Sequence, residues 1–172
     1  MTGVKGEETA IGKSETGLAR HEKVIAALIV LLSIAGIGVA GYLTYVHWLD
    51  KSVVCVVTSG CNEVAESEYA RLFGIPVAFV GLLGYVALLV TAVFWLLSGR
   101  RWDNWPLMAA WGMTLGGVAF SAYLTYVELF VIDAVCIWCV ISAVIMVGMF
   151  IVTTIGLLLS EGEQDEVDFD SA

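Results

Sequence analysis

Four long stretches without a charged residue constrain this chain more than any other feature. They contain 23, 24, 23 and 27 residues. A helix of about 20 residues is long enough to cross the hydrocarbon layer of a membrane, whereas barrel strands run about 10 residues with alternating polarity. The four stretches are residues 24–46, 75–98, 105–127 and 134–160. We therefore expect an all-α membrane protein, built as a bundle of four transmembrane helices.

The segments outside these stretches are polar. Residues 1–20 are rich in Gly and Glu, and residues 161–170 hold six acidic side chains. Such compositions predict a disordered N-terminus (1–20) and an acidic tail (161–172), on either side of a membrane domain at 21–160. The net charge is −9 and no basic patch is present, so nucleic acid is not an expected partner.

The basic residues indicate the orientation in the cell membrane. Six of the eight Lys and Arg residues precede the first stretch or lie between the second and third. Positive charge marks the cytoplasmic side, so both termini are predicted to be cytoplasmic. The connections 47–74 and 128–133 then face outward, where disulfides form and persist. The outer side thus holds all four cysteines, which are Cys55, Cys61, Cys136 and Cys139.

The cysteines form two pairs. Cys136 and Cys139 open the fourth stretch three positions apart, so both sulfurs lie on one side of a helix whose N-terminus favours a thiolate. We expect Asp133 to cap this helix. Cys55 and Cys61 enclose a loop that a disulfide can close, and a thiolate of one pair can attack the disulfide of the other. The pattern predicts a redox-active centre and no metal; a structural zinc site and a structural disulfide are the alternatives.

The residues after Cys61 have helical periodicity. Apolar side chains fall on one face between Asn62 and Phe73, which predicts an amphipathic helix that lies on the membrane surface as a lid. Gly74 is expected to end this helix, and Pro76 to begin the second span. The apolar residues of this face are Ala65, Tyr69, Leu72 and Phe73.

A short repeat relates the two halves of the chain. The sequence Tyr-Leu-Thr-Tyr-Val occurs at 42–46 and again at 123–127. In each copy the first tyrosine precedes a cysteine, Cys55 or Cys136, by 13 residues. The two cysteine pairs therefore occupy corresponding positions in the two halves.

These motifs carry a resemblance to a known family. The chain resembles the vitamin K epoxide reductase family in its bacterial and archaeal form, over about residues 24–160. The matching features are the four spans, the cysteine pair after the first span, and Cys-Ile-Trp-Cys opening the fourth. A further match is the pattern Cys61-x-x-Val-x-x-Ser67-x-Tyr69-x-Arg-x-Phe73-Gly. Prokaryotic members often carry a fused thioredoxin-like domain; we expect none here, so the resemblance implies a separate partner.

The resemblance also implies a role for each cysteine. Cys139 would face a quinone, and Cys136 would pair with it and exchange with Cys61. Cys55 would meet the thioredoxin-like partner on the outer face. The lid residues of the pattern are Ser67, Tyr69 and Phe73.

Together these features predict a membrane thiol:quinone oxidoreductase that generates disulfides, with menaquinone or ubiquinone as the electron acceptor. The alternative function is quinone or epoxide reduction of the vitamin K type. It is not the first choice, because the chain departs from the vertebrate enzymes at two positions. Ala143 stands where they have a tyrosine, and their quinone-binding asparagine has no match near Val77. An alternative of another class is a membrane adaptor with two structural disulfides. The candidate hydroxyl groups for a quinone carbonyl are those of Ser142, Tyr123 and Tyr126, together with Tyr42 and Tyr45.

Overall fold

The computed structural model describes residues 4–49, 54, 60–72, 74–98 and 105–170. Four of the described helices are long and apolar enough to cross a membrane, as the uncharged stretches predict. Their spans are Arg20–Trp48, Val77–Leu97, Trp105–Ile132 and Ile137–Ser160. The chain is therefore an all-α, multi-pass membrane protein. Residues 99–104, which connect the second and third spans in the sequence, lie outside the described residues.

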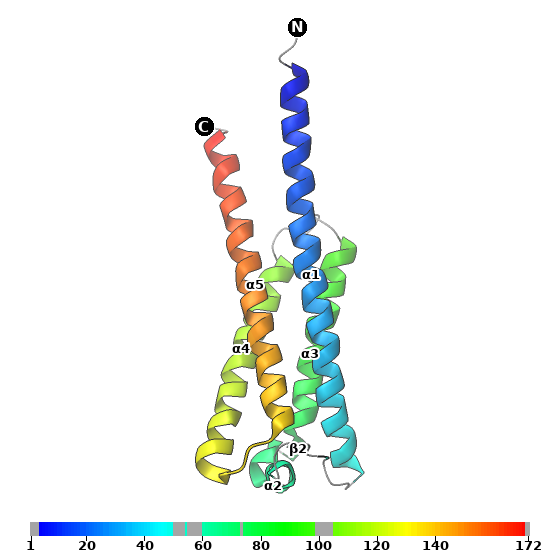
Figure 1. Ribbon diagram of the computed structural model, residues 1–172, viewed down its shortest axis with the longest axis vertical. Coiled ribbons are helices and arrows are strands. Elements are labelled where there is room, and N and C mark those ends of the chain that lie inside the picture. Colours follow the sequence, from blue (N-terminus) through cyan, green and yellow to red (C-terminus); the bar gives the residue numbers. More distant parts are fainter. Residues whose placement is uncertain (1–3, 50–53, 55–59, 73, 99–104, 171–172) are drawn as a thin grey trace.

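The four long helices form a bundle (Figure 1). Helix α1 packs against α3 and α5, and α4 packs against the same two neighbours. Both ends of the chain lie at one end of the bundle, and the short helix α2 lies at the other (Figure 1). Helices suit this environment because each satisfies its own backbone hydrogen bonds in lipid. The helices are α1 (Val4–Trp48), α2 (Cys61–Glu66), α3 (Val77–Ser98), α4 (Trp105–Val127) and α5 (Ile137–Asp170).

Two helices are longer than composition predicts. Helix α1 begins at Val4 and α5 continues to Asp170, so helix occupies most of the segments expected to be disordered. A helix that is already nucleated gains one backbone hydrogen bond for each residue added, without a further nucleation step. Polar residues can therefore continue a membrane-spanning helix into water.

The centre of the bundle contains one fully buried tyrosine. The ring of Tyr85, on α3, is 1% exposed and packs in a cluster with Ile29, Leu88 and Met149. It occupies the space beside Gly36 on α1, where a Cβ atom would overlap the Tyr85 ring. A glycine on α1 thus lets a large side chain of α3 enter the core.

This close contact leads to a stability prediction. Gly36→Ala is expected to destabilise the fold by about 1–3 kcal/mol, because the new methyl group displaces the Tyr85 ring. Gly38→Ala is the matched control on the same helix, since nothing lies within 4 Å of a Cβ atom at Gly38. Thermal unfolding in detergent would compare the two variants. Equal melting temperatures for both variants would contradict the proposed packing.

The connection between α2 and α3 differs from the predicted helix. Instead of one helix from Asn62 to Phe73, α2 ends at Glu66, and a 3₁₀ turn, η1 (Glu68–Ala70), follows. Two short antiparallel strands, β1 (Arg71–Leu72) and β2 (Ile75–Pro76), then pair Arg71 with Pro76. Phe73 lies outside the described residues.

Local backbone chemistry explains why the predicted lid helix is short. Ser67 is extended, with φ −65° and ψ 151°. Its amide and hydroxyl groups both donate to the Val64 carbonyl, at 3.3 and 2.7 Å. Serine side chains that bond to the backbone compete with helix continuation. Gly74 then has φ +84°, which glycine adopts readily, and allows the chain to reverse between β1 and β2.

The connection before α5 is also more ordered than a turn. A π-helical segment, η3 (Glu128–Ile132), continues α4, and Asp133 follows in the left-handed conformation with φ 55°. The prediction that Asp133 caps α5 is wrong. The Cys136 amide, directly before α5, donates a hydrogen bond to the Glu128 carboxylate instead, at 3.3 Å. The π-helical segment turns this acidic side chain toward the bundle.

Candidate redox site

Cys61 meets the Cys136–Cys139 pair at the end of the bundle opposite the termini. Cys61 begins α2 and Cys136 immediately precedes α5, and both lie in one buried cluster with Val46 of α1. Cys61 is fully buried and Cys136 is 3% exposed. Residues 75 positions apart in the sequence are thus brought together by the packing of α2 over the start of α5.

Gly60 allows this approach. A Cβ atom at Gly60 would meet the Val135 amide nitrogen at 2.9 Å and the Ala134 Cβ at 3.0 Å. The backbone before α2 therefore lies directly against the backbone before Cys136. No larger side chain fits at Gly60 without separating the two segments.

The cysteines differ in oxidation state. Cys61 is part of a disulfide, whereas Cys136 and Cys139 are free thiols. Cys55, the predicted partner of Cys61, lies outside the described residues. An oxidised cysteine thus lies in the same cluster as a reduced Cys136–Cys139 dithiol.

The Cys136 thiol, at the mouth of α5, is more acidic than an ordinary cysteine because its pKa is lowered. Cys136 lies just before the span that begins at Ile137, and a hydrogen bond from the Cys139 thiol lowers the Cys136 pKa to about 7. Burial and the negative charge of Glu128 oppose this shift. A pKa near 7 leaves a substantial thiolate fraction at neutral pH, and the thiolate is the nucleophilic form.

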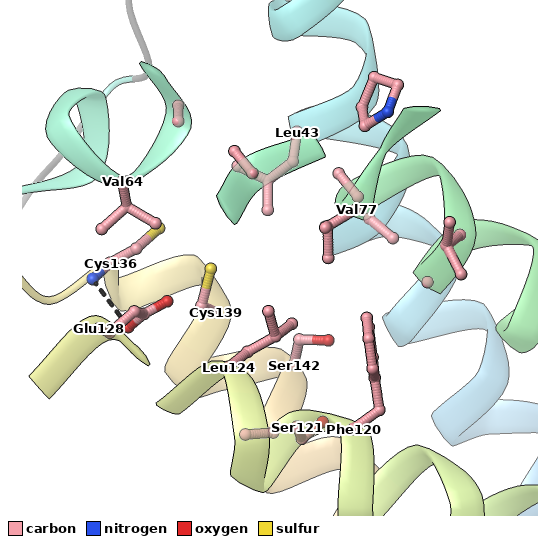
Figure 2. Close-up of a pocket in the computed structure, with 18 of the residues that line it drawn as sticks. Leu43, Val64, Val77, Phe120, Ser121, Leu124, Glu128, Cys136, Cys139 and Ser142 are labelled. Atoms are coloured by element: carbon pink, nitrogen blue, oxygen red, sulfur yellow. Dashed lines mark hydrogen bonds between the residues drawn. The ribbon is translucent and has the colours of Figure 1, made fainter. Parts of the chain in front are cut away.

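A cavity of about 1040 Å³ lies beside the dithiol. Its walls come from α1, α3, α4 and α5, and residues of α2 and η1 also line it. Figure 2 shows the Cys139 sulfur projecting into this space, near Leu124 and Ser142. Most of its lining is apolar, as expected of a pocket for a small hydrophobic ligand.

Ser142, one of the predicted quinone-binding residues, lies one turn after Cys139 and lines the cavity. Its hydroxyl and carbonyl oxygens lie 2.9 and 3.0 Å from the Tyr85 hydroxyl. Tyr85 lines the same cavity and was not among the predicted site residues. Its signal in the sequence is weak, because an isolated tyrosine in a membrane span resembles any other aromatic core residue.

The two tyrosines of the third span that the sequence suggests as quinone ligands lie outside the cavity. Tyr123 and Tyr126 are 53% and 58% exposed and do not line the cavity, and Tyr126 packs on Phe130 with ring centroids 5.0 Å apart. Tyr45 of the first span is 60% exposed as well. Side chains on the outer face of a bundle meet lipid, so these tyrosines have the surroundings of interfacial aromatics.

The repeated sequence therefore occupies two different environments. In the first copy, Tyr42 packs on Trp138 with ring centroids 4.9 Å apart, and its hydroxyl accepts a hydrogen bond from the Val54 amide at 3.3 Å. The Trp138 indole donates to the Val54 carbonyl at 3.1 Å. Both polar backbone groups of Val54 are thus held, directly before Cys55 in the sequence.

The lid residues contribute to the cavity to different extents. Ser67 and Tyr69 line it, and Tyr69 is also 49% exposed. Ala143, which replaces the tyrosine of the vertebrate enzymes, lies on the cavity wall, as does Val77. Among the described residues of α3 that line the cavity, Tyr85 is the one that carries a hydroxyl group.

Glu128 is the second site residue that sequence reasoning missed. It ends the third uncharged stretch and reads as a turn residue, yet its side chain is 5% exposed and lines the cavity with both thiols. Figure 2 shows its hydrogen bond to the Cys136 amide. The sequence shows only that Glu128 lies eight residues before Cys136. The contact between the Glu128 carboxylate and the Cys136 amide depends on the π-helical turn, which the sequence does not reveal.

Four helices long and apolar enough to cross a membrane thus hold a dithiol beside an oxidised cysteine, which defines a membrane protein with a candidate thiol-disulfide site. Residues 27–154 match the vitamin K epoxide reductase family, and the chain belongs to this family. It is similar to the thiol-disulfide oxidoreductase LTO1 of Arabidopsis thaliana, with 29% identity over 134 residues. That alignment covers 72% of this chain and 34% of the relative, so the chain spans about a third of the relative's length.

Proposed function

We propose that this protein is a thiol:quinone oxidoreductase that generates disulfides. Electrons pass from a thioredoxin-like partner to Cys55 and Cys61, then to Cys136 and Cys139, and finally to a membrane quinone of the menaquinone or ubiquinone type. The observation that carries this proposal is the shared buried cluster of Cys61 and Cys136, with Cys139 at the cavity behind them. Thiol-disulfide exchange requires such proximity, because one sulfur attacks the other directly.

The residues of the cavity suit a quinone. A quinone head is flat and apolar with two carbonyl oxygens, and it accepts the two electrons that a dithiol releases. The cavity supplies apolar walls, the Cys139 sulfur, and the hydroxyl groups of Tyr85 and Ser142 as hydrogen-bond donors. Its volume of about 1040 Å³ leaves room for the start of an isoprenoid tail.

The proposed orientation follows the basic residues. The end of the bundle that holds the cysteines faces outward, and both termini lie in the cytoplasm. A thioredoxin-like partner then meets the loop that carries Cys55. Tyr42 and Trp138 support this arrangement, since both hold the backbone of Val54 above the dithiol.

The proposal is tested with the purified protein in lipid nanodiscs. We expect it to reduce a short-chain ubiquinone or menaquinone when a reduced thioredoxin-like protein is supplied, as followed by quinone absorbance. In a Cys55→Ser, Cys139→Ser variant, Cys61 and Cys136 should accumulate as a mixed disulfide. A membrane adaptor with structural disulfides would instead keep Cys136 and Cys139 oxidised, whether the quinone is oxidised or reduced.

A further inference from the structure

Glu128 is a buried acidic side chain that the electron path does not use. It lies at the start of η3 and is 5% exposed. A buried carboxyl group is unfavourable unless it is hydrogen-bonded, and the contacts of Glu128 are with the dithiol. Its Oε2 accepts the Cys136 amide at 3.3 Å, and its carboxylate lies beside the Cys139 side chain on the wall of the same cavity (Figure 2). One carboxylate therefore touches both halves of the redox motif.

Other ionisable side chains line the same cavity, including His47, Glu66 and Arg71. Glu66 and Arg71 are exposed, whereas Glu128 is buried beside the reacting sulfur. A general base must lie within hydrogen-bond reach of the proton it removes. Among the described cavity residues, Glu128 is the buried carboxylate that lies beside the Cys139 thiol (Figure 2).

Oxidation of the dithiol requires proton removal. Two S–H bonds break and one S–S bond forms between Cys136 and Cys139, which releases two electrons and two protons. The electrons pass to the acceptor, which the proposed function takes to be a quinone. The quinone also takes up two protons in the overall reaction and becomes a quinol. Because the thiolate rather than the thiol is the reactive species, the proton of Cys139 must leave during this step.

We propose that Glu128 is the general base of dithiol oxidation: its carboxylate removes the proton of the Cys139 thiol as the disulfide forms. The proton then leaves Glu128 through the cavity, and the carboxylate is restored for the next cycle. The hydrogen bond to the Cys136 amide orients the carboxylate toward Cys139 throughout. This inference rests on the proposed function, because it assigns a residue to that reaction.

Two rates separate this role from a purely structural or electrostatic one. The first is quinone reduction by protein already reduced with a dithiol, measured by stopped-flow absorbance with a short-chain ubiquinone. The second is alkylation of the reduced thiols by iodoacetamide at pH 7 without quinone, followed by mass spectrometry of the peptide that carries Cys136 and Cys139.

Glu128→Gln is expected to move the two rates in opposite directions. Quinone reduction should fall at least about tenfold, since the base is lost. Alkylation should rise about threefold, because loss of a nearby negative charge favours the thiolate. Glu63→Gln is the matched control: Glu63 is an exposed carboxylate on α2 near the site, and its replacement should leave both rates unchanged. Glu128→Asp should retain part of the quinone reduction, because it keeps a carboxylate.

Each other outcome overturns the inference. If both rates fall, Glu128 supports the structure of the site. If both rise, its charge only represses the thiols, and if neither changes it is a spectator. An Asp variant as slow in quinone reduction as the Gln variant also contradicts a base. Failure of the proposed function is distinct, since the unaltered protein would then reduce no quinone at all.

Discussion

Cys139→Ala is expected to lower the rate of quinone reduction by roughly four orders of magnitude or more, as loss of a catalytic nucleophile does in other enzymes. The reason is geometric and chemical. The Cys139 sulfur is the thiol that projects into the cavity, and no other described sulfur occupies that position (Figure 2). Without it, neither the disulfide with Cys136 nor the transfer of two electrons can occur.

The measurement is quinone absorbance with excess reduced thioredoxin-like protein. Val144→Ala is the matched control, because Val144 lies on the same helix and is 66% exposed toward lipid. That variant should retain full activity. If the Cys139→Ala protein kept an appreciable fraction of the rate, electrons would have to leave from another site, and the proposed path would be wrong.

Gly60→Val is expected to slow electron transfer from the partner by about 100-fold, since a misplacement of about 1 Å between reacting groups has effects of that size. A Cβ atom at Gly60 already meets the Val135 nitrogen at 2.9 Å, and the two branches of valine add further overlap. The segment carrying Cys61 must then move away from Cys136. The distance between the two sulfurs increases, although every cysteine is still present.

Two electron donors distinguish this effect from general damage. A small dithiol such as dithiothreitol can reduce Cys136 and Cys139 directly, so quinone reduction with it should change little in Gly60→Val. The rate with a thioredoxin-like protein should fall. Gly38→Val is the control, because nothing lies within 4 Å of a Cβ atom there. Equal loss with both donors would mean that the substitution disturbs the cavity rather than the exchange between pairs.

The number and type of the spanning helices were predictable, because long uncharged stretches have one stable solution in lipid. The proximity of Cys136 and Cys139 was equally predictable, since positions i and i+3 share a helix face. The length of the lid helix was not, because the periodicity from Ala65 to Phe73 suggests a helix that the Ser67 hydrogen bonds to Val64 interrupt. Local side-chain competition with the backbone is difficult to recognise in a pattern of apolar residues.

The two tyrosine pairs illustrate the same limit. Tyr42 and Tyr123 stand in identical five-residue sequences, yet Tyr42 packs on Trp138 and Tyr123 is exposed. Which face of a helix turns inward depends on the helices packed against it, and the sequence of five residues does not contain that information. Tyr85 was missed for the related reason that its importance depends on Gly36 of another helix.

The sequence by itself determined that the protein crosses a membrane four times and carries a dithiol at one helix start. These are local properties: hydropathy over about 20 residues and the spacing of two cysteines. Only the tertiary structure decided that Cys61 lies against Cys136, that Tyr85 and Ser142 share a cavity wall, and that Glu128 is buried beside the thiols. Those contacts join residues on different elements, and close packing between the elements selects them.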